Sequence, residues 1–106
     1  MQRLTTPTHI FKMKENPNGW DKFRITYNQN GRTILEKTEQ DAQYMTIVQD
    51  QDTYILQYAL TQEESKRFTK DVMAKVQIKA HYPNGKVIAS KKFDLSVEDV
   101  LNKEIL

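Results

Sequence analysis

The sequence contains no cysteine and little glycine or proline, three residues of each among 106. Without cysteine the chain has neither a disulfide framework nor thiolate chemistry, which excludes a small extracellular scaffold held together by bridges. The scarcity of glycine and proline excludes a collagenous or low-complexity chain. No unbroken apolar run exceeds three residues. We therefore expect no membrane-spanning segment, and residues 1–7 lack the apolar stretch of a secretory signal.

The length of the chain fits one globular domain over residues 1–106, for which we expect a radius of gyration of about 13 Å. Apolar residues make up 38% of the chain, which is enough for one core. Charged residues make up 28%, close to the average for globular proteins.

Charge is distributed in blocks of alternating sign, although the net charge is only +2. Residues 1–35 sum to +4, residues 36–64 to −6, residues 65–92 to +7 and residues 93–106 to −3. In one interpretation the blocks become neighbouring strands with opposite charges facing each other on a solvated face. In the other, the +7 block forms a basic patch for an acidic partner or nucleic acid.

Alternation of apolar and polar residues dominates the chain and predicts β-strands. It is clearest at residues 20–28, 54–60 and 74–82, and weaker at 8–14, 33–37, 44–49 and 87–97. About seven short strands is the number expected of an immunoglobulin-like antiparallel β-sandwich, although the cysteine signature of antibody domains is absent. The sequence therefore predicts an all-β, Ig-like fold.

Asn84-Gly85 predicts a two-residue type I′ hairpin, because that turn needs positive φ at both central positions. The resulting register sets Ala80 against Ala89 and Lys75 against Asp94. It also sets Lys91 on the apolar face, where we expect a bulge or a strand edge.

Two further hairpins are expected. For Asn30-Gly31 a three-residue loop, residues 29–31, gives the better register, with Ile25 against Leu35. Residues 50–52 turn the third hairpin, without a glycine to define its register.

One short helix is predicted at residues 62–68. Thr61 and Glu64 have the spacing of a capping box, and Phe68 is expected to fill the corner between the sheets. The similar pattern at residues 96–99 could open a C-terminal helical turn or continue an edge strand.

Residues with catalytic or metal-binding potential do not form a recognisable site. His9 and His81 are interpreted as surface residues, and they lack the further ligands that zinc needs. No glycine-rich phosphate loop or activated nucleophile is evident. We therefore expect no enzyme activity, no cofactor, no metal and no small-molecule substrate.

The candidates for partner binding are Trp20, Lys75, Lys79 and Lys92. Trp20 follows a loop and is the aromatic residue least constrained by the strand pattern, which places it at the rim of the sandwich as a plug or an interface anchor. The lysines alternate along the basic strands and share one predicted face.

Several stretches resemble short proteins encoded in phages and prophages of low-GC Gram-positive bacteria (Firmicutes). The matching stretches are TPTHIF (6–11), ITYNQNG (25–31), ILEK (34–37), LTQEES (60–65) with Phe68, VQIK (76–79), NGKVIAS (84–90) and VEDVL (97–101). These are turn, cap and core residues, so the resemblance transfers no binding residue. The group is similar to Ig-like sandwich proteins encoded among virion morphogenesis genes, somewhat like the N-terminal sandwich of upper baseplate proteins. The segment at residues 41–44 is longer than in that group.

Three functions follow as hypotheses. The first is a non-enzymatic virion structural or accessory protein that contacts other phage structural proteins or itself. Such a protein is expected in the cytoplasm of the bacterial host during assembly and then in the virion. The second is a module that binds carbohydrate or peptide through Trp20 and a sheet edge. The third is weak nucleic-acid binding through Lys75, Lys79, Lys86 and Lys92.

Overall fold

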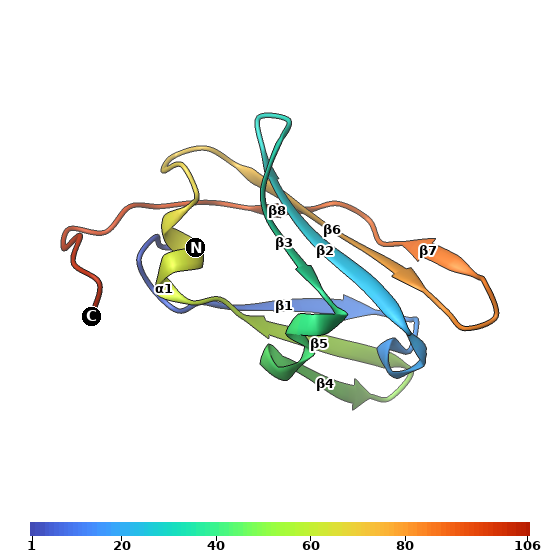
Figure 1. The fold of residues 1–106 in the computed structure, drawn as a ribbon. Helices are drawn as coiled ribbons and strands as arrows, with labels where there is room; N and C mark the ends of the chain where they lie inside the picture. The colour runs from blue at the N-terminus through green and yellow to red at the C-terminus, as the bar shows by residue number, and fades with distance from the viewer.

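A computed structural model describes residues Met1–Leu106 and contains eight β-strands in two facing antiparallel sheets (Figure 1). The strands are β1 (Thr8–Met13), β2 (Lys22–Gln29), β3 (Arg32–Thr38), β4 (Met45–Asp50), β5 (Thr53–Ala59), β6 (Ala74–His81), β7 (Val87–Ala89) and β8 (Phe93–Leu95). One sheet has the order β1-β5-β4, and the other has the order β3-β2-β6-β7 with β8 also paired to β6. Every predicted strand forms, the last of them divided into β7 and β8.

The strand order is that of an immunoglobulin sandwich. The sheet β1-β5-β4 corresponds to strands B, E and D of that fold, and β3-β2-β6-β7 corresponds to C′, C, F and G. The predicted Ig-like all-β fold is confirmed. In a complete immunoglobulin domain strand A lies beside strand B, whereas here β1 has no neighbour on that side within its sheet.

The chain crosses between the sheets three times, and each crossing contains a short helical segment. These are η1 (Pro17–Gly19), η2 (Glu39–Tyr44) and α1 (Gln62–Lys66). The η2 segment was not predicted from the sequence; Thr38 and Asp41 form a capping box at its start. No helix of the structure is long and apolar enough to cross a lipid bilayer.

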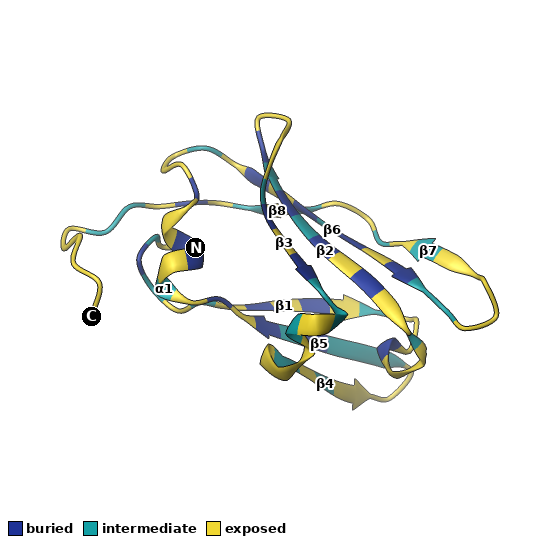
Figure 2. Cartoon of the chain, viewed as in Figure 1, coloured by how far each residue is buried: buried dark blue, intermediate teal, exposed yellow.

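The inward-facing residues of both sheets form one core of 14 buried residues (Figure 2). In β6 the even positions from Ala74 to Ala80 are buried and the lysines between them are exposed, as the alternation predicts. Phe68 packs edge-to-face against Tyr27, with ring centroids 5.6 Å apart. Phe68 is 1% exposed, which confirms its expected position in the corner.

The capping box of α1 forms as predicted. The Glu64 N–H donates to the Thr61 hydroxyl (3.1 Å), and the Thr61 N–H donates to the Glu64 carboxylate (3.0 Å). Glu64 also forms a buried ion pair with Lys37 of β3, which ties the helix to the five-stranded sheet. The helix ends at Lys66, two residues before the predicted end at residue 68.

The turn between β2 and β3 differs from the prediction. Gln29 pairs with Arg32, so the loop contains only Asn30 and Gly31, and both have positive φ. The three-residue loop is therefore wrong. An extra residue at position 34 bulges out of β3 and sets Ile25 opposite Lys37 rather than Leu35.

The turn between β6 and β7 also differs. The Gly85 N–H donates to the Tyr82 carbonyl, and only Gly85 of the Asn84-Gly85 pair has positive φ (+90°). The loop thus has three residues, beginning with Pro83, whose fixed φ suits the second position of a type I turn. Ala80 consequently pairs with Ile88, and the predicted pairing with Ala89 is wrong. The third hairpin has a two-residue loop, Gln51-Asp52.

Residues 96–99 do not form the helical turn that the second capping pattern allowed. Glu98 instead makes an isolated parallel bridge with Gln2. Asp99 accepts from the Arg3 guanidinium (3.1 Å), and its pKa is lowered, first by the hydrogen bond from Lys103. Arg3 also donates to the Lys66 carbonyl (3.1 Å), and the Leu106 N–H donates to the Gln62 side chain (2.9 Å), so both ends of the chain lie beside α1.

Candidate functional site

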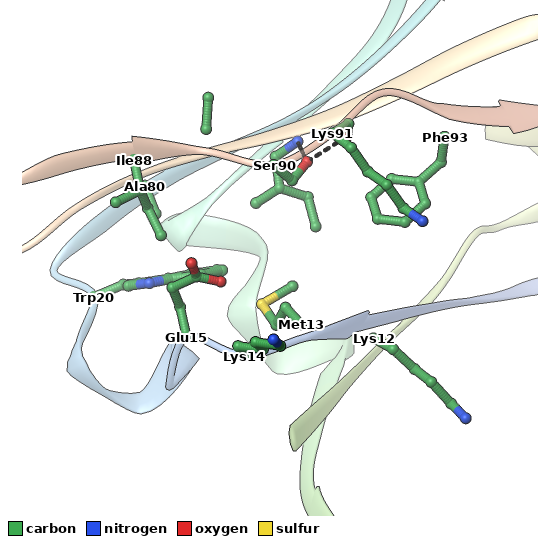
Figure 3. Close-up of a pocket in the computed structure, with 12 residues that line it drawn as sticks. Lys12, Met13, Lys14, Glu15, Trp20, Ala80, Ile88, Ser90, Lys91 and Phe93 are labelled. Atoms are coloured by element: carbon green, nitrogen blue, oxygen red, sulfur yellow. Dashed lines mark hydrogen bonds between the residues drawn. The ribbon is translucent and has the colours of Figure 1, made fainter. Parts of the chain in front are cut away.

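The sandwich is open along one side, between β1 of the smaller sheet and the β7–β8 edge of the larger one. Two adjoining pockets, of about 310 and 280 Å³, lie along this opening, and Phe93 lines both of them. We call the pair of pockets the seam groove. Figure 3 shows the larger pocket, with Trp20 at one end, Phe93 at the other and Met13 between them.

A bulge in the larger sheet leaves the groove open. Ala89 pairs with Lys79, but the next pair is Phe93 with Val76, so residues 90–92 contain one residue more than the opposing strand. Ser90 holds this bulge in place, since its hydroxyl accepts from the Ile78 N–H (3.0 Å). The predicted irregularity around Lys91 is confirmed.

The floor of the groove is apolar and its rim is charged. In the larger pocket the apolar lining includes Met13, Trp20, Ile78, Ile88 and Phe93, and the rim carries three lysines and one carboxylate. These rim residues are Lys12, Lys14, Glu15 and Lys91. A mostly basic rim around an apolar floor suits an extended segment that carries apolar and acidic side chains.

Two buried nitrogens beside the groove have no hydrogen-bond partner: His9 Nε2 and Trp20 Nε1. The Trp20 indole N–H is a donor only. The other ring nitrogen of His9 bonds the Tyr27 hydroxyl (2.7 Å), and when that hydroxyl donates, His9 Nε2 carries the ring hydrogen. Both atoms are donors for which this chain supplies no acceptor, and both are inaccessible to solvent in the unbound structure.

His9 is 9% exposed, so its interpretation as a surface residue is wrong. Burial lowers its pKa from 6.5 to about 4 and keeps the ring neutral at physiological pH. Burial also raises the pKa of the Tyr27 phenol, which bonds the His9 ring. His81, by contrast, lies partly exposed at the surface and bonds Asp21 (2.6 Å), whose pKa this hydrogen bond lowers.

Trp20 lies at the rim, where the sequence placed it. Its ring packs against Phe23, with centroids 6.0 Å apart, and it covers one end of the core while lining the groove. Of the two roles that the sequence left open, the structure bears out the plug, and the interface anchor stays a prediction.

The three predicted lysines gather on another surface, the outer face of the five-stranded sheet. Lys75, Lys79 and Lys92 line a polar depression of about 560 Å³ that has no apolar lining residue. Lys75 pairs with Asp94, as predicted, and is opposite it in the ladder. Lys79 and Lys92 have no carboxylate within 4.0 Å.

Arg24 occupies the same depression, which we call the basic face. Its guanidinium contacts Glu36 (3.7 Å) and Glu39 (2.8 Å), so part of the acidic 36–64 block lies beside the basic strands. The pKa of Glu39 is lowered, chiefly by backbone hydrogen bonds and also by Arg24. The charges are therefore interleaved at Arg24 and Lys75, and uncompensated at Lys79 and Lys92.

The sequence did not identify the groove itself. The out-of-phase Lys91 was the one available signal, because a bulge there implies an interrupted edge. The buried position of His9 had only a weak signal, its alternation with Phe11 and Met13 along the inner face of a weakly patterned strand. No group of three or more His, Asp or Glu side chains is placed to hold a metal ion.

No protein-family model matches this chain, and no curated protein sequence matches it. Among solved structures, the V domain of amphioxus IgVJ-C2 is similar, with a TM-score of 0.35 and 12% sequence identity. The match covers 92% of this chain and 96% of that one.

Proposed function

We propose that this protein is a non-enzymatic interaction module that accepts an extended segment of another protein along the free edge of β1. The observation that carries the proposal is the combination of an unpaired strand edge with two buried, unpartnered nitrogens beside it. Addition of a strand to an exposed sheet edge is an established mode of peptide recognition, in which main-chain hydrogen bonds give affinity and side-chain pockets give specificity.

Physical costs in the unbound protein support this function. A buried donor without a partner costs about 1–3 kcal/mol. A segment that displaces part of the groove lining and brings carbonyl groups to His9 and Trp20 would relieve that cost, while its apolar side chains would cover the groove floor. Binding therefore gains more here than at an edge whose neighbouring groups are already satisfied.

The resemblance to phage proteins makes another virion structural protein the expected partner. In that setting the module works by repeated protein–protein contact within a particle, after assembly in the host cytoplasm. The absence of a catalytic constellation in the sequence fits such a role.

A peptide-display selection against the immobilised protein tests the proposal. We expect enrichment of extended peptides with alternating apolar residues and acidic residues. Trp20→Phe keeps the aromatic packing but removes the indole N–H, so it should weaken binding by roughly three- to tenfold, the worth of one hydrogen bond. Equal melting temperatures of the two proteins would show that the fold is intact. Selected peptides that bind both proteins equally would contradict the proposal.

A second function, polyanion binding, is favoured by the uncompensated Lys79 and Lys92 on the basic face. Fluorescence anisotropy with a labelled oligonucleotide at about 150 mM salt measures it. Sub-micromolar binding that Lys92→Glu abolishes would favour this function. We expect weak binding that collapses with added salt, because the basic face engages few phosphates.

A further inference from the structure

The four sheet edges of the sandwich differ in how they are terminated. In the larger sheet, β3 carries a bulge at residue 34, and the opposite edge is broken into β7 and β8. Bulges and short strands are common means by which proteins prevent edge-to-edge pairing. In the smaller sheet, β1 and β4 are each six residues long, contain no proline and keep an unbroken register with β5 (Figure 1). Only the smaller sheet therefore has two regular, open edges.

The two open edges carry opposite charges at the same end of the sheet. Both β1 and β4 are antiparallel to β5, so they run in the same direction. The end of β1 carries Lys12 and Lys14, and the end of β4 carries Asp50 and Asp52. These four residues take part in none of the ion pairs of the chain, so their charges are available to a partner.

The outward-facing residues of the two edges also match in type. On β1 they are Thr8, Ile10 and Lys12, and on β4 they are Thr46, Val48 and Asp50. Ile10 is 58% exposed and Val48 is 46% exposed, both unusually high for branched apolar residues. One parallel register sets threonine beside threonine, isoleucine beside valine, and lysine beside aspartate.

We propose that β1 of one copy pairs in parallel with β4 of a second copy of this chain, in the register that sets Ile10 beside Val48 and Lys12 beside Asp50. This inference rests on the strand-accepting function proposed above and names its partner. The contact joins two different surfaces, so it is heterologous and repeats from copy to copy into a ring or an open chain. The three-stranded sheets of successive copies then form one continuous sheet.

Neighbouring registers are less favourable. A shift by one residue turns the inward side of β4 toward the outward side of β1, because side chains alternate along a strand. A shift by two residues keeps an opposite-charge contact, either Lys14 with Asp50 or Lys12 with Asp52. It sets Ile10 beside Thr46 or Asp50, however, and so removes the apolar contact of Ile10 with Val48.

Charge-reversal variants test the contact, because Lys12 and Asp50 are exposed and unpaired in the monomer. Sedimentation velocity of the wild-type protein up to about 1 mM should show association that increases with concentration. Lys12→Asp alone and Asp50→Lys alone should each weaken association by about tenfold, since each creates a like-charge contact. Lys22→Asp, at an exposed lysine on another strand, should leave association unchanged.

An equimolar mixture of the Lys12→Asp and Asp50→Lys proteins should regain association. In the mixture every contact can again join opposite charges, which an isologous dimer through β1 alone would not achieve. Recovery in the mixture, and in a chain carrying both substitutions, supports the proposal. A wild-type protein that stays monomeric throughout, or variants that associate like wild type, overturns it.

Introduced thiols test the register, because the chain has no cysteine of its own. A mixture of Ile10→Cys and Val48→Cys proteins, mildly oxidised, should form the mixed disulfide in excess over either symmetric one, since neighbouring Cα atoms in a sheet lie within disulfide range. A strict monomer that still binds selected peptides in a Trp20-dependent manner would overturn the self-contact alone. Loss of that peptide binding as well would remove the strand-accepting function.

Discussion

At the scale of single residues, the burial of His9 beside the groove makes the stability of the fold depend on pH. The ring lies between the two sheets, and burial lowers its pKa from 6.5 to about 4. The folded state therefore binds a proton more weakly than the unfolded chain does. The stability associated with neutral His9 is fully present above pH 6.5 and is lost as the pH falls toward 4.

We expect the free energy of unfolding to fall by up to about 3 kcal/mol across this window because of His9 alone. Urea denaturation at closely spaced pH values measures the slope. His9→Gln cannot titrate but can still bond the Tyr27 hydroxyl, so it should flatten the curve between pH 4 and 6.5. His81→Gln, at the partly exposed histidine, is the matched control for the loss of an imidazole. A His9→Gln curve parallel to that of wild type would show that His9 is not the source.

At the scale of elements, α1 depends on its capping box. Thr61→Ala removes the acceptor of the Glu64 N–H and should lower the free energy of unfolding by about 1 kcal/mol. Thr61→Ser keeps the hydroxyl and should cost much less. An unchanged denaturation midpoint for Thr61→Ala would argue that the crossover is held by the Glu64–Lys37 ion pair instead.

The β6–β7 turn depends on the positive φ of Gly85. An added Cβ would meet no atom within 4 Å, so the cost of substitution arises from the backbone conformation rather than from a clash. Gly85→Val should therefore destabilise the protein by about 1–2 kcal/mol. Gly85→Asn should cost less, because asparagine tolerates the left-handed region. Similar melting temperatures for both variants would contradict this explanation.

The elements also show where sequence reasoning succeeds and fails. Alternation predicts the strands well, because one face of each is buried in the same core. The loop lengths predicted for the two glycine-containing hairpins are reversed in the structure. The loop at Asn30-Gly31 has two residues, and the loop at residues 83–85 has three. Pro83 favours a type I turn at one hairpin, and the bulge at residue 34 permits the two-residue Asn30-Gly31 loop at the other. A bulge changes register without changing the local turn signal, so the turn residues alone could not define the pairing.

At the scale of the whole molecule, the sandwich is elongated. Its extents are 46 × 27 × 24 Å and its radius of gyration is 14.3 Å, larger than the value of about 13 Å expected for a chain of this length. The β2–β3 hairpin projects from one side and the C-terminal segment from one end (Figure 1), which accounts for the difference. The strand edges lie along this elongated body, which favours lateral contact over contact through a single tip.

The candidate site was only partly predictable at this scale. Trp20 at the rim and Lys75 opposite Asp94 followed from local pattern. The seam groove could not be predicted, because it depends on three features together. These are an edge of β1 without a neighbouring strand, a bulge at residues 90–92, and the position of Phe93 in both pockets. The groove arises where segments far apart in the chain pack together, as Phe11 and Phe93 do with ring centroids 5.2 Å apart, and no local periodicity encodes such packing.

Amide hydrogen exchange, followed by NMR, tests the central claim most directly. The measurement compares the protein alone and saturated with a peptide from the display selection. We predict slower exchange at the β1 amides that point away from β5, at the open edge of the sheet. The signals of the Trp20 indole N–H and of the His9 ring should also shift. Protection confined to the strands around Lys79 and Lys92, with β1 unchanged, would contradict the account and assign binding to the basic face.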